Sequence, residues 1–270
     1  MVGLNYNIIC IYIRCLLKEK NMQNLDLKNK IALVTGGSNG IGAETVKMLA
    51  SSGAIVLIGY FNGVDRANEL IKSIPGNDHQ IIRVKLESFE NSSKIFQKIK
   101  TDYGKLDILV NSAGFTKPIP HKNINELNEN LFDQILTANV LGPYSIIRAL
   151  VPLLSLGKDS VVINVSSISA FTGSGSNIAY CASKGALDTM TMSLARAFGP
   201  KIRFLCVSPA AVATDFVEGR DRDALAVLAE KTPLQRIVEP QDVALSIMAC
   251  ITHLKTATGS KIIIDGGRHL

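Results

Sequence analysis

The sequence IALVTGGSNGIG spans residues 31–42 and joins an aliphatic, β-branched run to a glycine-rich turn. Its first five residues have the composition of a buried strand. The glycines allow a tight turn and a close approach of the backbone to a pyrophosphate. A helix predicted at Ala43–Ser52 would then direct free N–H groups at that anion. This order predicts a dinucleotide-binding unit, and the simpler interpretation is a tight strand-to-helix turn without a ligand.

Short runs rich in β-branched residues alternate with longer helical stretches along the rest of the chain. Strands that are apolar on both faces are typical of a parallel sheet covered by helices on both sides. The predicted strands are Ile31–Thr35, Ala54–Tyr60, Gln80–Leu86, Leu106–Val110, Ser160–Val165, Ile202–Val207 and Lys261–Ile264. The sequence therefore predicts an α/β protein of one domain, with a Rossmann-like, doubly wound, mainly parallel sheet of seven strands.

Residues 1–21 differ from the rest of the chain. They hold a short apolar stretch, residues 8–17, followed by basic residues, whereas a secretory signal has its basic residues before the apolar core. Too few Arg and Ser residues are present for a typical mitochondrial presequence, which stays open as an alternative. We expect residues 1–21 to be a disordered extension or a misassigned start before Met22, and residues 22–270 to form the domain.

Composition excludes several classes of protein. With 47% apolar and 19% charged residues the chain is neither disordered nor fibrous. Five cysteines without a C-x-x-C pair and four scattered histidines predict no disulfide framework and no metal site, and they favour a reducing, cytoplasmic setting. The net charge of +6 comes from dispersed residues, so we expect no nucleic-acid partner. No apolar run reaches the ~18 residues of a membrane span, so we expect no membrane partner either.

Further motifs follow the glycine turn in a fixed order. They are Asn111-Ser112-Ala113-Gly114, Asn139, Ser167, Tyr180-Cys-Ala-Ser-Lys184, Pro209 to Thr214, and Thr258-Gly259 with Asp265-Gly266-Gly267. Together with Thr35-Gly36-x-x-x-Gly40-x-Gly42 this series resembles the short-chain dehydrogenases/reductases over residues 22–270. The general organisation resembles the 3-oxoacyl-carrier-protein reductase branch of that family. The resemblance implies an NAD(P)-dependent enzyme.

Tyr180 and Lys184 lie four residues apart in a segment that reads as a helix, so their side chains project from the same face. A free tyrosine has a pKa of about 10 and exchanges its proton poorly at neutral pH. A nearby ammonium stabilises the phenolate and lowers that pKa toward the range of an acid–base catalyst. The pair therefore indicates proton transfer, although a surface Tyr/Lys pair of no consequence is common.

The resemblance implies roles for four catalytic residues. Ser167 would hold the substrate oxygen, and Tyr180 would transfer the proton. Ser166, the neighbour of Ser167, is the alternative residue for the first role. Lys184 would also bind the nicotinamide ribose. Asn139 would hold a water that links Lys184 to solvent, and its simpler role would be to bond the backbone groups of a broken helical turn. The expected cofactor contacts are Thr35, Gly36, Ser38, Asn39, Gly40, Ile41, Gly42, Tyr60, Asn111, Ala113, Gly114, Tyr180, Lys184, Pro209, Val212 and Thr214.

Three residues depart from the family pattern. Ser112 stands where the family has an asparagine, Ala210 where it has a glycine, and Lys85 where it has an aspartate that binds the adenine. The end of the second strand, at Tyr60 or its neighbours Phe61 and Asn62, also lacks the carboxylate that accepts hydrogen bonds from the ribose of NAD. Without that repulsion of a 2′-phosphate, NADP(H) is favoured over NAD(H), with Arg66 as a candidate partner.

The predicted activity is the interconversion of a ketone and a secondary alcohol. The apolar segment 209–235 reads as a substrate loop and lid, and an acyl thioester, such as a 3-oxoacyl group, suits it. Steroid, sugar and small-alcohol substrates stay open. The resemblance implies a homotetramer or homodimer. A catalytically silent, NAD(P)-binding regulator is the alternative function, and the Ser167, Tyr180 and Lys184 set speaks against it.

Overall fold

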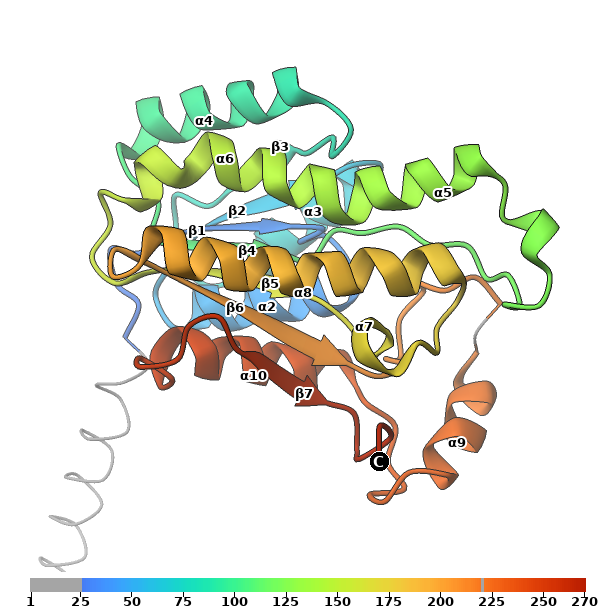
Figure 1. Ribbon diagram of the computed structural model, residues 1–270. Coiled ribbons are helices and arrows are strands. Elements are labelled where there is room, and N and C mark those ends of the chain that lie inside the picture. Colours follow the sequence, from blue (N-terminus) through green and yellow to red (C-terminus); the bar gives the residue numbers. More distant parts are fainter. Residues whose placement is uncertain (1–25, 220) are drawn as a thin grey trace, which may run out of the picture.

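The computed structural model describes residues 26–219 and 221–270, so the extension predicted at residues 1–21 lies outside them. Within the described part, seven strands form one parallel sheet in the order β3-β2-β1-β4-β5-β6-β7 (Figure 1). The strands are β1 (Ile31–Thr35), β2 (Ile55–Tyr60), β3 (Gln80–Arg83), β4 (Ile108–Asn111), β5 (Ser160–Val165), β6 (Ile202–Pro209) and β7 (Lys261–Ile264). The predicted fold is confirmed, and the strand ends differ by a few residues.

Helices cover both faces of the sheet because each strand is apolar on both sides (Figure 1). In β1, Ala32 and Val34 enter one buried cluster, whereas Ile31 and Leu33 enter the other. The first cluster includes residues of α2 (Gly40–Ser51), α3 (Val64–Ser73) and α10 (Pro240–Thr252). The second includes residues of α4 (Phe89–Tyr103), α6 (Gly142–Leu154) and α8 (Ile178–Phe198). The shorter helices are η1 (Ile124–Glu126), α5 (Glu129–Leu136), α7 (Ser169–Thr172) and α9 (Arg222–Glu230).

The order of the strands decides where a ligand can bind. The chain runs outward from β1 through β2 to β3 and then returns to place β4 on the other side of β1. The loops that leave β1 and β4 therefore diverge at the carboxyl edge of the sheet. Such a switch point is where ligands bind in doubly wound sheets.

The first helix begins earlier than predicted. It starts at Gly40 rather than Ala43, because the Asn39 side chain caps it by accepting a hydrogen bond from the Gly40 N–H at 2.9 Å. The last glycine of the turn therefore lies inside the helix. A Cβ atom at Gly42 would be 2.2 Å from the Gly36 carbonyl oxygen, so the turn and the helix pack backbone against backbone.

The helical stretch Glu129–Leu154 is the one segment, among the residues with described structure, that is long and apolar enough to cross a membrane. Half of its most apolar window is buried inside the protein. Ile146, Ile147 and Leu150 belong to the core beneath the sheet, so this stretch has the burial of a core helix. It contains a π-helical turn, η2 (Thr137–Leu141), between α5 and α6.

Candidate active site

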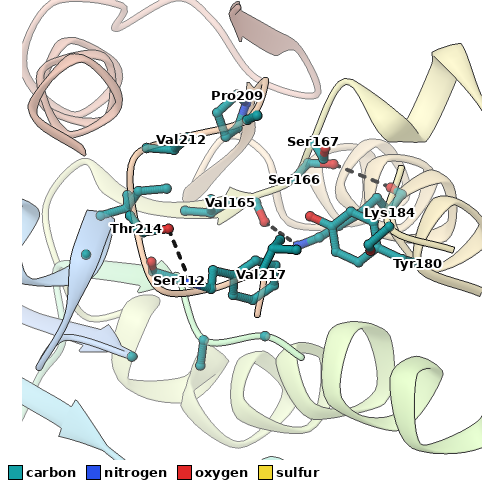
Figure 2. A pocket seen from close by; sticks show the side chains of 18 of the residues that line it. Ser112, Val165, Ser166, Ser167, Tyr180, Lys184, Pro209, Val212, Thr214 and Val217 are labelled. Atoms are coloured by element: carbon teal, nitrogen blue, oxygen red, sulfur yellow. Dashed lines mark hydrogen bonds between the residues drawn. The ribbon is translucent and has the colours of Figure 1, made fainter. Parts of the chain in front are cut away.

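A cavity of about 510 Å³ opens at the carboxyl edge of the sheet and is lined by the segments that follow β1, β2, β4, β5, β6 and β7 (Figure 2). Most of the predicted site residues line it. These are Gly36, Ser38, Asn39, Gly40, Ile41, Ala113, Gly114, Ser167, Tyr180, Lys184, Pro209, Val212 and Thr214. Thr35, Gly42, Tyr60, Asn111 and Asn139 do not line it.

The glycine turn after β1 forms one wall of the cavity by close backbone packing. Gly36 has a φ of +64°, and a Cβ atom there would lie 2.9 Å from the backbone of Ala113. Gly40 also has a positive φ, +51°, which L side chains rarely adopt. The turn thus leaves space beside the N-terminus of α2, where N–H groups face the cavity. This cradle fits a pyrophosphate.

Thr35 and Asn111 hold this wall from behind. The Thr35 hydroxyl accepts a hydrogen bond from the Ala113 N–H at 3.2 Å and ties the loop after β4 to β1. The Asn111 side chain donates to Asn164 at 2.8 Å, and Asn164 in turn donates to Thr191 at 2.8 Å. Thr35 and Asn111 are buried behind the wall of the cavity and support it without lining the cavity themselves.

Asn139 lies in the middle of the π-helical turn and holds two neighbouring segments. Its side-chain oxygen accepts a hydrogen bond from the Phe115 N–H at 2.8 Å, and its amide nitrogen donates to the Phe115 carbonyl at 2.9 Å. The same nitrogen donates to the Ser183 hydroxyl on α8 at 3.1 Å. Asn139 therefore connects the chain that leaves β4 to the helix that holds Tyr180.

Tyr180 and Lys184 lie on successive turns of α8, which begins at the side-chain cap of Asn177. The Lys184 ammonium lies 5.6 Å from the centre of the Tyr180 ring and donates to the Val165 carbonyl at 2.8 Å (Figure 2). Burial lowers the pKa of Lys184 to about 8, although nearby Cys206 and Asp188 act in the opposite direction. Lys184 is thus mostly charged at neutral pH and close enough to stabilise a phenolate.

Ser167 follows β5 directly and is buried at the floor of the cavity. Its hydroxyl donates to the Ser169 hydroxyl at 3.1 Å and accepts from the Ser169 N–H at 3.1 Å. The neighbouring Ser166 also lines the cavity, and its hydroxyl is directed at the Lys184 carbonyl at 3.5 Å (Figure 2). The Ser166 hydroxyl is therefore engaged with the backbone of α8, whereas the Ser167 hydroxyl bonds within its own loop.

The predicted substrate loop divides between two places. Residues 209–212 and 214–217 line the main cavity, and the Phe216 ring centre lies 6.1 Å from that of Tyr180. Leu225 and Leu228 line a separate, much smaller pocket, and the Val227 side chain is exposed. Within the predicted substrate loop and lid, residues 209–217 thus border the cavity, whereas α9 turns its apolar side toward the second pocket.

Sequence reasoning missed several cavity residues. They lie in the loop after β5 and in the turn after β7, and they are Ser169, Thr172, Ser174, Gly175, Ser176 and Arg268. No fixed spacing marks them, and the only signal was their place after predicted strands that end at the same sheet edge. Across residues 26–219 and 221–270, the structure holds no group of three His, Cys, Asp or Glu side chains suited to a metal ion.

Comparison with known proteins agrees with this geometry. Residues 36–269 match a family model described as enoyl-(acyl carrier protein) reductase. The chain belongs to the short-chain dehydrogenase/reductase family. A 3alpha-hydroxysteroid dehydrogenase of Mediterraneibacter gnavus is 31% identical over 247 residues, which are 89% of this chain and 97% of that protein. The 3-oxoacyl-(acyl-carrier-protein) reductase FabG of Thermotoga maritima is 28% identical, over 89% of this chain and 98% of that protein.

A solved dehydrogenase/reductase from Sinorhizobium meliloti has 33% identity and a TM-score of 0.84 to this short-chain dehydrogenase/reductase, over 93% of this chain and all of that chain. The protein is therefore an oxidoreductase that acts on CH–OH and C=O groups with a nicotinamide dinucleotide. The residues present fit such a cofactor. Gly36 and Gly40 provide the backbone cradle, and the cavity extends from that cradle to Ser167 and Tyr180.

Proposed function

We propose that this oxidoreductase interconverts a ketone and a secondary alcohol, with Ser167, Tyr180 and Lys184 around the reacting atoms. One observation above all supports this proposal. The three side chains come from two different elements, and they share a single cavity with the glycine turn of β1. A nucleotide-binding regulator has no need of an acid–base tyrosine beside a buried lysine, so the enzyme is the better interpretation.

The cofactor supplies or accepts the hydride when it is bound. In the direction of reduction, the Ser167 hydroxyl binds the carbonyl oxygen and Tyr180 donates its proton to that oxygen. The Lys184 ammonium lowers the pKa of the Tyr180 phenol. The side chain of Asn139 is engaged with Phe115 and Ser183, so the relay of protons predicted for it would have to use its main chain.

We also propose that NADP(H) is preferred over NAD(H). Among the described residues that line the cavity after β2, none is acidic, and Arg66 is the charged one. Its guanidinium lies against Gly63, where a Cβ atom would be 2.6 Å from the Arg66 Nη2 atom. A 2′-phosphate would meet a cation here and no carboxylate. Of the three residues expected at this place, Phe61 and Asn62 line the cavity and Tyr60 does not.

The proposed substrate has an apolar part close to its carbonyl. Ile168, Ala211, Phe216 and Val217 line the cavity beyond Ser167 and Tyr180. The names of the relatives, a 3-oxoacyl reductase and a hydroxysteroid dehydrogenase, favour a 3-oxoacyl thioester or another amphipathic ketone. An assembly of two or four copies and a cytoplasmic setting are part of the same proposal.

Consumption of reduced cofactor in the presence of ethyl 3-oxobutanoate tests this function. We expect the purified protein to oxidise NADPH faster than NADH and to form the 3-hydroxy ester. The Ser167→Ala variant should lose most of that rate and still bind NADPH. A protein that binds NADPH and consumes none with a panel of neutral ketones would support the silent regulator instead.

A further inference from the structure

Arg268 is a cation of the cavity that has no part in the proposed ketone reduction. The charged residues that line the cavity, within the described chain, are Arg66, Lys184, Asp215 and Arg268. Arg66 follows β2 at the cofactor end, and Lys184 lies beside Tyr180. Arg268 follows β7 at the opposite edge of the sheet. The cavity therefore has one arginine at each end.

The strand order shows which end Arg268 occupies. β2 and β7 are separated by five strand steps, which is roughly 24 Å at about 4.8 Å per step. The cradle for the cofactor begins at β1 and β2, and Ser167 at the end of β5 marks the reacting atoms. β7 lies two further steps away, or roughly 10 Å. Arg268 is thus beyond the reacting atoms, on the side left for the substrate.

The guanidinium of Arg268 has no protein partner among residues 26–219 and 221–270. The nearest acidic residue in sequence, Asp265, is engaged with its own turn. One carboxylate oxygen accepts from the Gly267 N–H at 2.9 Å, and the other accepts from the His269 N–H at 2.9 Å and the His269 ring at 2.7 Å. Asp265 is also buried. It therefore fixes the turn and leaves the charge of Arg268 available.

The turn that holds Arg268 is fixed from a second side as well. The His269 ring packs edge-on against Phe171 of α7, with the ring centres 5.8 Å apart. This contact ties the turn after β7 to α7, which follows Ser167. An anion in this place would meet a guanidinium fork on a backbone that is held in position. Carboxylates suit such a fork because they accept two parallel hydrogen bonds.

We propose that Arg268 binds a carboxylate at the far end of the substrate, so that the enzyme prefers oxo acids to neutral ketones. This inference rests on the function proposed above and narrows it. The carboxylate lies about two strand spacings, roughly 10 Å, from the reacting carbonyl. Ala210 and Ala211 line this cavity and also share the smaller pocket with Arg268, so they would contact the chain between the two groups.

The test compares 9-oxodecanoate with its methyl ester as substrates for NADPH oxidation. We expect the wild-type protein to favour the acid by about tenfold in kcat/KM, because one partly exposed ion pair is at stake. Arg268→Met should bring the ratio of acid to ester close to one, through a higher KM for the acid. The kcat/KM for the ester should change far less than that for the acid, so the ratio of the two decides. Arg268→Lys should retain part of the preference.

Arg196→Met is the matched control. Arg196 is exposed on α8, lies outside the cavity and carries the same charge, so this variant should keep the wild-type ratio. A wild-type ratio near one, or a ratio that Arg268→Met leaves unchanged, would overturn the proposal and leave the ketone reductase intact. If neither compound is reduced, calorimetry with both still decides. Equal binding of acid and ester in the presence of NADP⁺ would overturn the role of Arg268.

Discussion

The two ends of the cavity are built from different parts of the chain. The end near β1 and β2 is made of backbone, with Gly36 and Gly40 in the left-handed region and Gly42 packed against a carbonyl oxygen. The end near β5 and β7 is made of side chains, which α8 and two separate loops bring together. Binding a pyrophosphate requires the backbone to approach the anion closely, and side chains would prevent this approach. Positioning a carbonyl requires individual functional groups.

This difference explains what a change at either end should do. A substitution in the backbone end disturbs the cofactor and the fold together, because turn and helix share their packing. A substitution in the side-chain end removes one chemical group and leaves the surrounding structure in place.

The largest expected effect is that of Tyr180→Phe, at the side-chain end. Loss of the hydroxyl removes the proposed proton donor and should lower kcat by about a thousandfold, or ~4 kcal/mol in barrier. NADPH binding, measured by fluorescence titration, should change less than about twofold, because the ring remains. A rate within about tenfold of the wild-type rate would show that another group transfers the proton.

Gly42→Ala addresses the backbone end. Its Cβ atom would lie 2.2 Å from a backbone oxygen that no rotamer change can move. We expect a loss of about 2 kcal/mol or more in unfolding free energy and at least tenfold weaker NADPH binding.

Gly185→Ala on α8 is the control for this change. A Cβ atom there would meet only the Ala170 carbonyl oxygen, at 3.4 Å, and alanine suits a helix interior. Stability should be unchanged or slightly raised. If both variants behave alike in thermal unfolding and in NADPH titration, the backbone end is not specially constrained.

Lys184 lies where the two ends meet, and its buried charge predicts a pH effect on stability. Its pKa is lowered to about 8, mainly by burial, from the ordinary value of 10.5. Between these values the unfolded chain binds more protons than the native protein, so this residue makes stability rise with pH. Denaturant unfolding of Lys184→Met should lack this rise.

The wild-type protein without cofactor should gain on the order of 1–2 kcal/mol relative to Lys184→Met between pH 7.5 and pH 10. Because the pKa of Tyr180 responds to Lys184, the same pair is also compared in the Tyr180→Phe background, where the remaining groups that titrate in this range are common to both proteins. A constant difference across the range would show that Lys184 has an ordinary pKa.

Phe61→Asp is the smallest expected effect and sharpens the description of the cofactor end. Phe61 is half-exposed at the mouth of the cavity after β2, and the Arg83 guanidinium carbon lies 5.9 Å from its ring centre. A carboxylate here would repel a 2′-phosphate and should weaken NADPH binding about fivefold relative to NADH, or ~1 kcal/mol. Phe61→Ala, which adds no charge, should leave the ratio of the two dissociation constants unchanged.

The backbone end could be predicted from the sequence because its constraint is local. Glycines stand where the turn between β1 and α2 comes close to neighbouring backbone, and they therefore fall within one short stretch, residues 36–42. The strands could also be predicted, because each one packs against both core clusters and is therefore a continuous apolar run in the sequence. The start of α2 was placed three residues late, since Asn39 caps the helix within the turn. Glycines alone did not suggest a helix start.

The side-chain end could be predicted only where a helix sets the spacing. Tyr180 and Lys184 are four residues apart, so α8 alone brings them together. Arg268 and the loop at Ser174–Ser176 are far apart in sequence and line the same cavity because β7 and β5 end at the same sheet edge. At the end of β2 the sequence left Tyr60, Phe61 and Asn62 as candidates, and the tertiary structure shows that the last two line the cavity. Such convergence depends on the tertiary fold.

The most direct test of this account is transfer of deuterium from NADPH labelled at the nicotinamide C4 position to ethyl 3-oxobutanoate. In the proposed reaction, the cradle and the Ser167–Tyr180 pair bring cofactor and carbonyl into contact in one cavity. Mass spectrometry should then find one deuterium on the carbinol carbon of the 3-hydroxy ester, from one face of the nicotinamide only. A reduced product without deuterium at that carbon, or no product beside tightly bound NADPH, would contradict it.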